Sequence, residues 1–344
     1  MRATEGIDAQ RVTQWLRQHT ALTPPLTFHP ITGGHSNLTF LVKDAANRQW
    51  VLRRPPLNSV LATAHDMGRE HRIISALADS DVPVPATIAM CDDASVTGAP
   101  FYVMAHVDGV VVRDATIAQE LSMPHRRLAS ADLISVLARL HRIRPDDVGL
   151  GDLGRRESYV ARQLRRWDRQ VRSLSTRELP LLFSVHEQLT KTIPPQHSAG
   201  IVHGDYKIEN CIVGDDGRIA AVLDWELCTL GDVRADVGML MVYWVEPEDT
   251  LHPLVHPPTS IGGFARRRDL LERYCAETGS DFPEIDYFVA FAYWRLACII
   301  EGVYTRYKAA AMGGHIPDNV ERFARAVEQL TERAADILGG TSAV

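Results

Sequence analysis

The chain has 344 residues, of which 45% are hydrophobic and 23% are charged, and its formal net charge is −6. This balance is typical of a globular protein and excludes a disordered chain. A nucleic-acid-binding protein normally carries an excess of basic residues, so the charge argues against that class.

Cysteine usage and hydropathy indicate the compartment. The five cysteines are scattered and form no CxxC pair, which suits neither a disulfide framework nor a zinc site and predicts a reducing cytoplasm. The first 20 residues lack an apolar stretch and therefore predict no signal peptide. The apolar stretch 287–300 is interrupted by Arg295 and followed by Glu301, so we expect a buried core helix and no membrane contact.

The first hundred residues predict a small lobe rich in β-structure. Asp8 is a plausible N-cap for a short amphipathic helix, and a second helix is expected at residues 66–78. Alternating or β-branched runs bounded by turn residues predict five strands, at residues 26–31, 38–42, 49–53, 86–91 and 100–106.

After Gly109 the sequence predicts mainly helices. Apolar residues recur at helical spacing in the segments 130–142, 158–172, 179–192, 232–245, 267–278, 287–310 and 318–338. One β-hairpin interrupts them, with strands at 211–214 and 219–223 around the turn Asp215-Asp216-Gly217. We therefore predict an α+β, bilobal protein, with an N-terminal lobe at 1–106, a C-terminal lobe at 107–344 and a ligand cleft between them.

The segment 201–210 reads IVHGDYKIEN, and residues 222–226 read VLDWE. Phosphoryl transfer needs a carboxylate that accepts the proton of the attacking hydroxyl, a cation near the phosphate and oxygen ligands for magnesium. Asp205, Lys207, Asn210 and Asp224 supply these groups in that order. Asp205 and Lys207 are thus candidate catalytic residues, and Asn210 and Asp224 are candidate metal ligands. The hairpin is expected to bring both ends of this segment together.

This pattern resembles the kinase catalytic loop H-x-D-x-K-x-x-N. The H-G-D opening, and D-W-E in place of D-F-G, make it similar to the aminoglycoside phosphotransferase and choline-kinase-like family. The resemblance implies a protein-kinase-like fold and a small-molecule kinase that uses ATP and magnesium. The missing A-P-E motif disfavours a protein kinase. We expect His203, His141, Asp232 and Asp236 to be structural.

The resemblance also implies a nucleotide site in the N-terminal lobe. Kinases hold phosphates with a basic residue of the third strand that a helix glutamate orients, and Arg53 and Glu70 fit these places, with Arg54 as the alternative. Lysine is usual where this chain has arginine, which can bind phosphate through a bidentate fork. The alternative is an exposed, functionless pair.

Two backbone elements complete the predicted nucleotide site. The loop 32–37 reads TGGHSN, and its glycines allow amides to approach a phosphate while a serine adds a hydroxyl donor. Residues 101–109 fall where the hinge between lobes is expected. The predicted nucleotide-binding residues are Gly34, Ser36, Asn37, Arg53, Glu70, Ala105 and Val107, the last two through backbone groups that face adenine.

The sequence leaves two classes of phosphate acceptor as alternatives. Segments such as 64–71 and 98–104 make the sequence similar to the family branch found fused to acyl-CoA dehydrogenases, which implies a hydroxyacyl-CoA-like metabolite. The parent family implies an aminoglycoside-like compound. Because the kinase pattern fills these 344 residues, we expect no dehydrogenase module within them. Five arginines between residues 162 and 172 form either a solvated face or an anion site. The competing functional class is a weakly active or inactive nucleotide-binding module.

Overall fold

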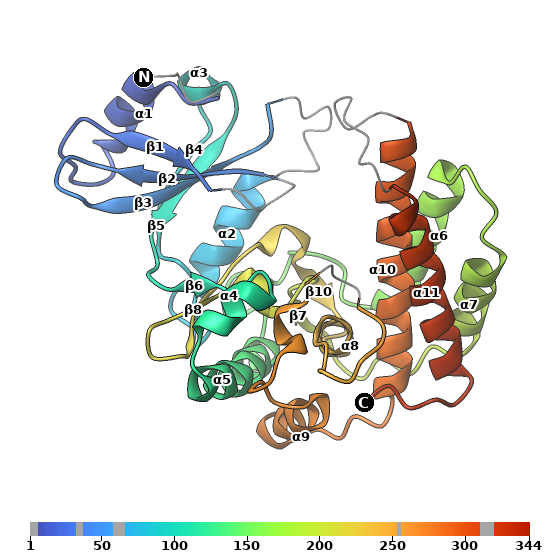
Figure 1. Ribbon diagram of the computed structural model, residues 1–344. Helices are drawn as coiled ribbons and strands as arrows, with labels where there is room; N and C mark the ends of the chain where they lie inside the picture. The colour runs from blue at the N-terminus through green and yellow to red at the C-terminus, as the bar shows by residue number, and fades with distance from the viewer. Residues whose placement is uncertain (1–5, 32–36, 58–65, 253–255, 310–319) are drawn as a thin grey trace.

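The computed structural model describes residues 6–31, 37–57, 66–252, 256–309 and 320–344. It has a β-sheet part at the N-terminus and a larger helical part at the C-terminus (Figure 1), which confirms the predicted α+β, protein-kinase-like fold. The boundary predicted at residues 106 and 107 falls between the last strand of the sheet and the next strand, and it stays a prediction.

The N-terminal part is a five-stranded antiparallel sheet with the strand order β1-β2-β3-β5-β4. The strands are β1 (Thr27–Pro30), β2 (Leu38–Lys43), β3 (Gln49–Arg54), β4 (Thr87–Cys91) and β5 (Phe101–Ala105). Helices α1 (Ala9–Leu16), α2 (Met67–Leu77) and α3 (Ala94–Thr97) accompany it. These elements agree with the predicted ones to within about two residues, except for the short α3.

Strand alternation divides the apolar residues between two cores. Trp50 and Leu52 of β3 lie in one cluster with Val12 and Leu16 of α1. Val51, between them in the chain, belongs to the other cluster with the apolar face of α2. Because successive strand residues point to opposite faces, β3 packs on α1 with one face and turns its other face toward α2 and the helical part.

The C-terminal part is built mainly of helices. They are α4 (Ala115–Glu120), α5 (Met123–Arg142), α6 (Tyr159–Leu174), α7 (Pro180–Lys191), α8 (Arg234–Tyr243), α9 (Arg267–Thr278), α10 (Ile285–Lys308) and α11 (Glu321–Leu338). Helix α5 begins seven residues before the predicted start, because Ser122 accepts a hydrogen bond from the His125 amide and so caps the helix there. Helix α4 was not predicted.

Helix α10 passes through the middle of the helical part (Figure 1). It is long and apolar enough to span a membrane by length and composition, but most of it is buried inside the protein. It packs against α6, α8 and α11, which confirms the prediction of a core helix.

Short strands connect the hinge to the predicted hairpin. Strand β6 (Val110–Val111) pairs with β8 (Cys211–Val213), and β8 pairs with β9 (Ile219–Val222). A two-stranded sheet joins β7 (Gly200–Val202) to β10 (Thr229–Gly231). Gly109 has φ +138°, and a Cβ there would lie 2.5 Å from the Val213 carbonyl oxygen. Glycine thus lets the chain pass closely over β8 as it leaves the sheet.

Candidate active site

The predicted catalytic segment lies between β7 and the β8–β9 hairpin. It includes a 3-10 turn, η1 (Ile208–Asn210), and a second turn, η2 (Trp225–Leu227), follows the hairpin. The Leu223 amide donates a 2.8 Å hydrogen bond to the Asn210 carbonyl oxygen. This bond closes the base of the hairpin and places Asn210 beside Asp224, as the sequence predicts.

The Asp205 carboxylate has two polar neighbours. Its Oδ2 atom lies 2.8 Å from Lys207 Nζ and accepts a 3.0 Å hydrogen bond from Asn210 Nδ2. Asn210 Nδ2 also donates to the Asp205 carbonyl oxygen at 2.8 Å. Because the nitrogen of this amide is committed to Asp205, its Oδ1 atom is the one left to ligate a metal.

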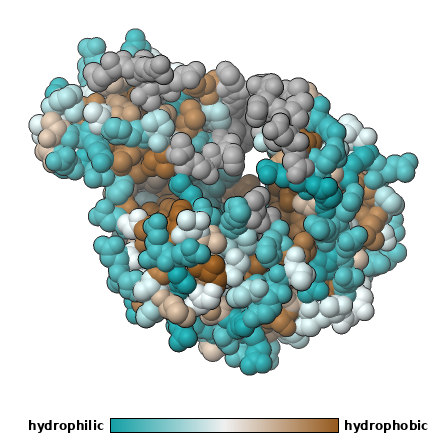
Figure 2. Space-filling view, in the orientation of Figure 1, coloured by the Kyte–Doolittle hydropathy of each residue, from teal (hydrophilic) through white to brown (hydrophobic). Residues whose placement is uncertain are grey.

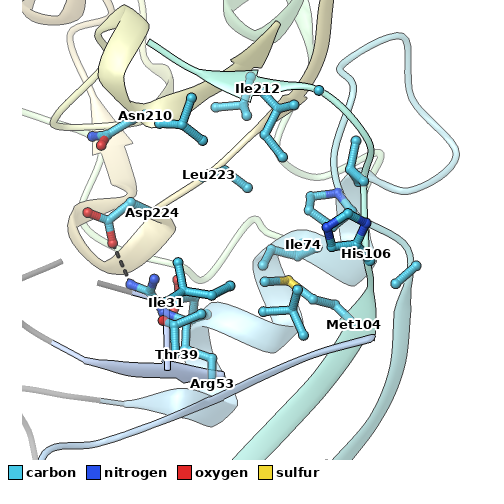
Figure 3. Close-up of a pocket in the computed structure, with 18 of the residues that line it drawn as sticks. Ile31, Thr39, Arg53, Ile74, Met104, His106, Asn210, Ile212, Leu223 and Asp224 are labelled. Carbon is cyan, nitrogen blue, oxygen red and sulfur yellow. Dashed lines mark hydrogen bonds and ion pairs between the residues drawn. The ribbon is translucent and has the colours of Figure 1, made fainter. Parts of the chain in front are cut away.

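Asp224 is held in an uncommon backbone conformation. Its φ is 65° and its ψ is 60°, in the left-handed region that non-glycine residues seldom occupy. Its Oδ1 atom lies 2.5 Å from an Arg53 guanidinium nitrogen, the contact drawn as a dashed line in Figure 3. Such conformations persist where the surrounding structure enforces them, and they are concentrated at functional sites.

Arg53 connects Asp224 to the N-terminal sheet. Its Nε atom donates a 3.1 Å hydrogen bond to Glu70 of α2, a helix that Asp66 caps. Burial alone would lower the pKa of Arg53, but the charges of Glu70 and Asp224 outweigh it and raise that pKa. The guanidinium is therefore a permanent cation that faces both carboxylates.

The alternative residue, Arg54, points elsewhere. Its guanidinium donates to the carbonyl oxygens of Gly6 and Thr97 and so connects the segment before α1 to the end of α3. The structure thus places Arg53, and not Arg54, at the predicted phosphate site.

A pocket extends from this cluster to the hinge. Asn210 and Asp224 lie at one end and residues 104–107 line the other, with Ile74, Ile212 and Leu223 along the walls (Figure 3). In Figure 2 the surface is hollowed between the N-terminal and helical parts. A flat apolar slot with backbone at one end and polar side chains at the other suits a nucleotide.

The remaining nucleotide-site predictions are placed as follows. The Ala105 amide donates to the Ala86 carbonyl oxygen at 2.8 Å, so the Ala105 carbonyl is its remaining hinge group, and Val107 also lines the pocket. Asn37 Nδ2 donates to Glu226 Oε2 at 3.3 Å, which links the loop before β2 to the residue two places after Asp224. Gly34 and Ser36 lie outside the described residues.

Helix α8 anchors the predicted catalytic loop, residues 203–210, through Asp236. Asp236 accepts hydrogen bonds from the backbone amides of His203 at 2.6 Å and Gly204 at 2.8 Å. Burial would raise the pKa of Asp236, but contacts with His141, His203 and Gly204 outweigh it and lower that pKa. His203 Nε2 bonds the Leu223 carbonyl oxygen at 3.0 Å. These contacts agree with the structural roles expected for His141, His203 and Asp236, which stay predictions.

Three further residues at the site were not predicted. Glu209 lines the pocket, and neither of its carboxylate oxygens has a hydrogen-bond partner among the described residues although both are buried. Burial raises the pKa of Glu209 to about 7, partly offset by Lys207. Tyr243 carries Lys207 Nζ 4.4 Å above its ring centre, and Arg295 donates to the Gly204 carbonyl oxygen at 2.8 Å. Of these three residues, only Glu209 had a signal in the sequence, because it is a carboxylate directly before the predicted metal ligand Asn210.

Most of the arginine cluster on α6 is a solvated face. Four of its arginines are exposed, and the last one pairs with Asp168 at 2.8 Å. Arg162 differs because it is half-buried. The exposed four are Arg165, Arg166, Arg169 and Arg172.

No group of three or more His, Cys, Asp and Glu side chains gathers as a metal site in the part of the chain that the structure describes. The pair Asn210 and Asp224 nonetheless fits magnesium. It supplies hard oxygen ligands, and magnesium completes its octahedral shell with phosphate oxygens and water.

Residues 27–286 match the model of the phosphotransferase enzyme family, and the chain therefore belongs to that family. Mouse acyl-CoA dehydrogenase family member 10 is 32% identical over 89% of this chain and 29% of its own length. Human acyl-CoA dehydrogenase family member 11 is 30% identical over 94% of this chain and 42% of its length. The chain thus spans less than half of these curated relatives.

Solved structures show the same fold. A putative aminoglycoside phosphotransferase from Ralstonia eutropha is 28% identical, with a TM-score of 0.81 over 97% of this chain and 99% of that chain. An aminoglycoside phosphotransferase solved in ternary complex with streptomycin and ATP is 15% identical, with a TM-score of 0.59 over 96% of this chain and 98% of that chain. This second likeness concerns the fold alone.

Proposed function

We propose that the protein is an ATP- and magnesium-dependent phosphotransferase that phosphorylates a hydroxyl group of a small molecule. The observation that carries this proposal is that Asn210 and Asp224 lie at one end of a pocket whose other end is the hinge, with Asp205 hydrogen-bonded to Asn210. A nucleotide with its base at residues 104–107 would present its phosphates to Asn210 and Asp224, beside Asp205. Membership of the phosphotransferase family supports the same activity.

The residues have distinct proposed roles. The acceptor oxygen forms a bond to the γ-phosphorus, the bond from that phosphorus to the β-phosphate oxygen breaks, and the hydroxyl proton passes to the Asp205 carboxylate. Lys207 lies close enough to Asp205 to neutralise charge on the transferred group. Arg53, which Glu70 orients, is the candidate contact for the remaining phosphates.

Asn210 and Asp224 would hold magnesium through Oδ1 and the carboxylate. When bound, the ion would supply positive charge that offsets the charge of the phosphates and stabilises the transition state. Arg53 contacts Asp224 Oδ1 and would compete with a metal ion for the charge of this carboxylate.

For the acceptor, we propose a hydroxyacyl-CoA-like metabolite ahead of an aminoglycoside-like compound. The curated relatives are named acyl-CoA dehydrogenase family members, whereas solved neighbours are aminoglycoside and macrolide phosphotransferases. We further propose a cytoplasmic enzyme whose partner is this small molecule, with no nucleic acid or membrane involved.

The test is a screen of magnesium-dependent ATP consumption against hydroxyacyl-CoAs, aminoglycosides, macrolides and amino alcohols. We expect turnover with one of these classes and a loss of about 10²–10⁴-fold in kcat for Asp205→Asn, since the base is removed while the shape is kept. If the wild type binds ATP but phosphorylates no acceptor, the alternative of a nucleotide-binding module replaces this proposal. If ATP does not bind at all, both fail.

A further inference from the structure

Arg295 of α10 is a buried cation without an ion-pair partner in the described part of the chain. It is 5% exposed, and among the described residues its one hydrogen bond goes to the Gly204 carbonyl oxygen. Its Nε–H is buried and has no partner among the same residues. Burying a charge is costly unless another charge compensates it. Four other arginines with mostly buried side chains are compensated by carboxylates, namely Arg53 by Glu70 and Asp224, Arg177 by Glu301, Arg234 by Asp232 and Arg267 by Asp249. Arg54, which is 3% exposed, instead donates to three carbonyl oxygens, whereas Arg295 donates to one.

Two side chains of α6, the helix that packs against α10, also have buried donors without acceptors among the described residues. The Arg295 guanidinium carbon lies 5.9 Å from the Trp167 ring centre, and the Trp167 indole N–H is buried without a partner. One terminal guanidinium nitrogen of Arg162 is likewise buried and has no hydrogen-bond partner among the described residues. We call Arg162, Trp167 and Arg295 the donor group.

The donor group is cationic as a whole. Neither Arg162 nor Arg295 forms an ion pair within the residues that the structure describes, and burial together with Arg155 lowers the pKa of Arg162. Burial raises the pKa of Tyr159 to about 12, and the charges of Arg295 and Arg162 both oppose this rise. The Arg162 guanidinium carbon lies 5.9 Å from the Tyr159 ring centre, and α6, which carries both residues, packs against α10, which carries Arg295.

Arg295 connects this group to the predicted catalytic loop. It contacts the carbonyl of Gly204, the residue directly before Asp205. Since neighbouring Cα atoms are about 3.8 Å apart, the residue that Arg295 contacts is one peptide unit from the proposed base. None of the three residues lines the pocket that extends to the hinge.

We propose that the donor group binds an anionic group, a carboxylate or a phosphate, of the acceptor whose hydroxyl Asp205 deprotonates. This inference rests on the proposed function and narrows its acceptor to anionic molecules. An anion would accept hydrogen bonds from the unpaired N–H groups and supply the charge that Arg295 lacks. A polycationic acceptor would leave these donors unpaired and add repulsion.

The test compares acceptors that differ only in charge. We use β-hydroxybutyrate, γ-hydroxybutyrate and δ-hydroxyvalerate, each with its uncharged primary amide. For the wild type we expect kcat/KM to favour the carboxylate of the best-fitting length by about 10- to 100-fold, the range typical of a charge-assisted hydrogen bond. Arg295→Gln, which keeps a donor for the Gly204 carbonyl, should remove this preference mainly through KM. Arg295→Lys should retain part of it.

Two further variants serve as controls. Arg162→Gln should weaken the same preference if Arg295→Gln fails to fold, and exposed Arg165→Gln on the same helix should leave it intact. A wild type that phosphorylates carboxylates and amides equally would overturn the inference. So would an Arg295→Gln variant in which both acceptors decline equally, since that would be a loop-positioning effect alone.

Failure of the proposed function gives a different result. Binding of γ-hydroxybutyrate and of inorganic phosphate is measured by calorimetry without nucleotide, on wild type and Arg295→Gln. Anion binding that Arg295→Gln abolishes, with no phosphoryl transfer to any acceptor, would support the anion site and contradict the kinase activity. Turnover of neutral acceptors without any anion binding would support the kinase activity and contradict the anion site.

Discussion

Arg53 contacts two carboxylates with different proposed duties, Glu70 as its orienting partner and Asp224 as a metal ligand. A guanidinium can serve both at once because its donors are spread along a planar fork. A lysine ammonium has three donors on one nitrogen and would contact both carboxylates only if they approached that single atom. The arginine at this strand position is thus compatible with a working phosphate site.

From this geometry we expect Arg53→Lys to remain active, with the KM for ATP changed by less than about tenfold. Arg53→Met, which removes the charge, should lower kcat/KM for ATP by about 10²-fold or more. Steady-state kinetics at varied ATP measures both. Arg54→Lys is the matched control, because Arg54 faces the chain start, and its KM for ATP should match the wild type. Equal kinetics for Arg53→Met and wild type would exclude the proposed phosphate contact.

Glu209 predicts a pH dependence of stability. Although the residue is only half-buried, both of its oxygens are inaccessible, and burial raises its pKa to about 7, against about 4.3 in an unfolded chain. Between these values the folded state holds a proton that the unfolded chain has lost. The free energy of unfolding therefore falls as the pH rises from about 4 to about 7.

Glu209→Gln removes this titration. We expect the variant to be more stable than wild type at pH 8, by about 1–3 kcal/mol, and the difference to vanish near pH 4. Urea unfolding across the pH range measures it. Exposed Glu120→Gln serves as the control and should show no such trend. A Glu209→Gln difference that does not vary with pH would contradict the buried, partnerless carboxylate.

At the scale of residues, the sequence predicts site residues that belong to a motif with fixed spacing. Asp205, Lys207, Asn210 and Asp224 stand at motif spacings, and the structure brings them together, while their roles stay predictions. Tyr243 and Arg295 could not be found in this way. They reach the loop from distant helices, and their positions depend on how α8 and α10 pack.

At the scale of elements, two helices hold the predicted catalytic loop through hydrogen bonds to the backbone of Gly204. Its amide donates to Asp236 of α8, and its carbonyl accepts from Arg295 of α10. The residue has φ +88°, and a Cβ there would lie 2.8 Å from the Leu227 carbonyl oxygen. Glycine is required both for the dihedral angle and for the approach of the chain after η2.

Gly204→Ala should therefore destabilise the protein by about 1–3 kcal/mol and displace Asp205. We expect a lower Tm and a kcat reduced by more than about tenfold, since small displacements of catalytic groups are costly. Gly262→Ala is the control, because a Cβ there meets nothing within 4 Å. Wild-type kcat in a folded Gly204→Ala protein would show that the loop tolerates a shift.

Elements with a strong periodic signal could be predicted, and those fixed by local or long-range hydrogen bonds could not. The stripe of α5 marks residues 130–142, but its first turn depends on the Ser122 cap. Strands β6, β7 and β10 have only two or three residues, too few to show alternation. Their pairing depends on chain segments far away in the sequence.

At the scale of the whole molecule, the proposed nucleotide would contact both parts of the fold. Arg53 comes from the sheet, and Asn210 and Asp224 come from the hairpin of the helical part. Any ligand that binds only the folded state stabilises it, by about 2.7 kcal/mol at a concentration 100 times its Kd.

We therefore expect ATP with magnesium to raise the Tm clearly, ATP alone to raise it less, and magnesium alone not to raise it. Asp224→Asn should lose the additional effect of magnesium while it keeps the effect of ATP, because asparagine tolerates the left-handed backbone but lacks the charge. Thermal shift measurements test this. Stabilisation by magnesium alone would show that Asp224 is accessible to the ion without nucleotide.

The overall arrangement of two lobes could be predicted because the change from alternating to helical periodicity near residue 109 is pronounced. The relation between the lobes could not, since it depends on single contacts between distant segments. Asn37 with Glu226 and Arg53 with Asp224 are two of these contacts.

The ion pair between Arg53 and Asp224 has a consequence for the order in which substrates arrive. While the guanidinium holds the carboxylate, a free divalent cation meets a ligand already neutralised by the protein's own charge. Phosphates that draw Arg53 toward themselves would release Asp224 at the moment when the accompanying ion needs it. If Asp224 is a metal ligand as proposed, we expect metal and nucleotide to enter as one chelate and the nucleotide-free enzyme to bind magnesium weakly.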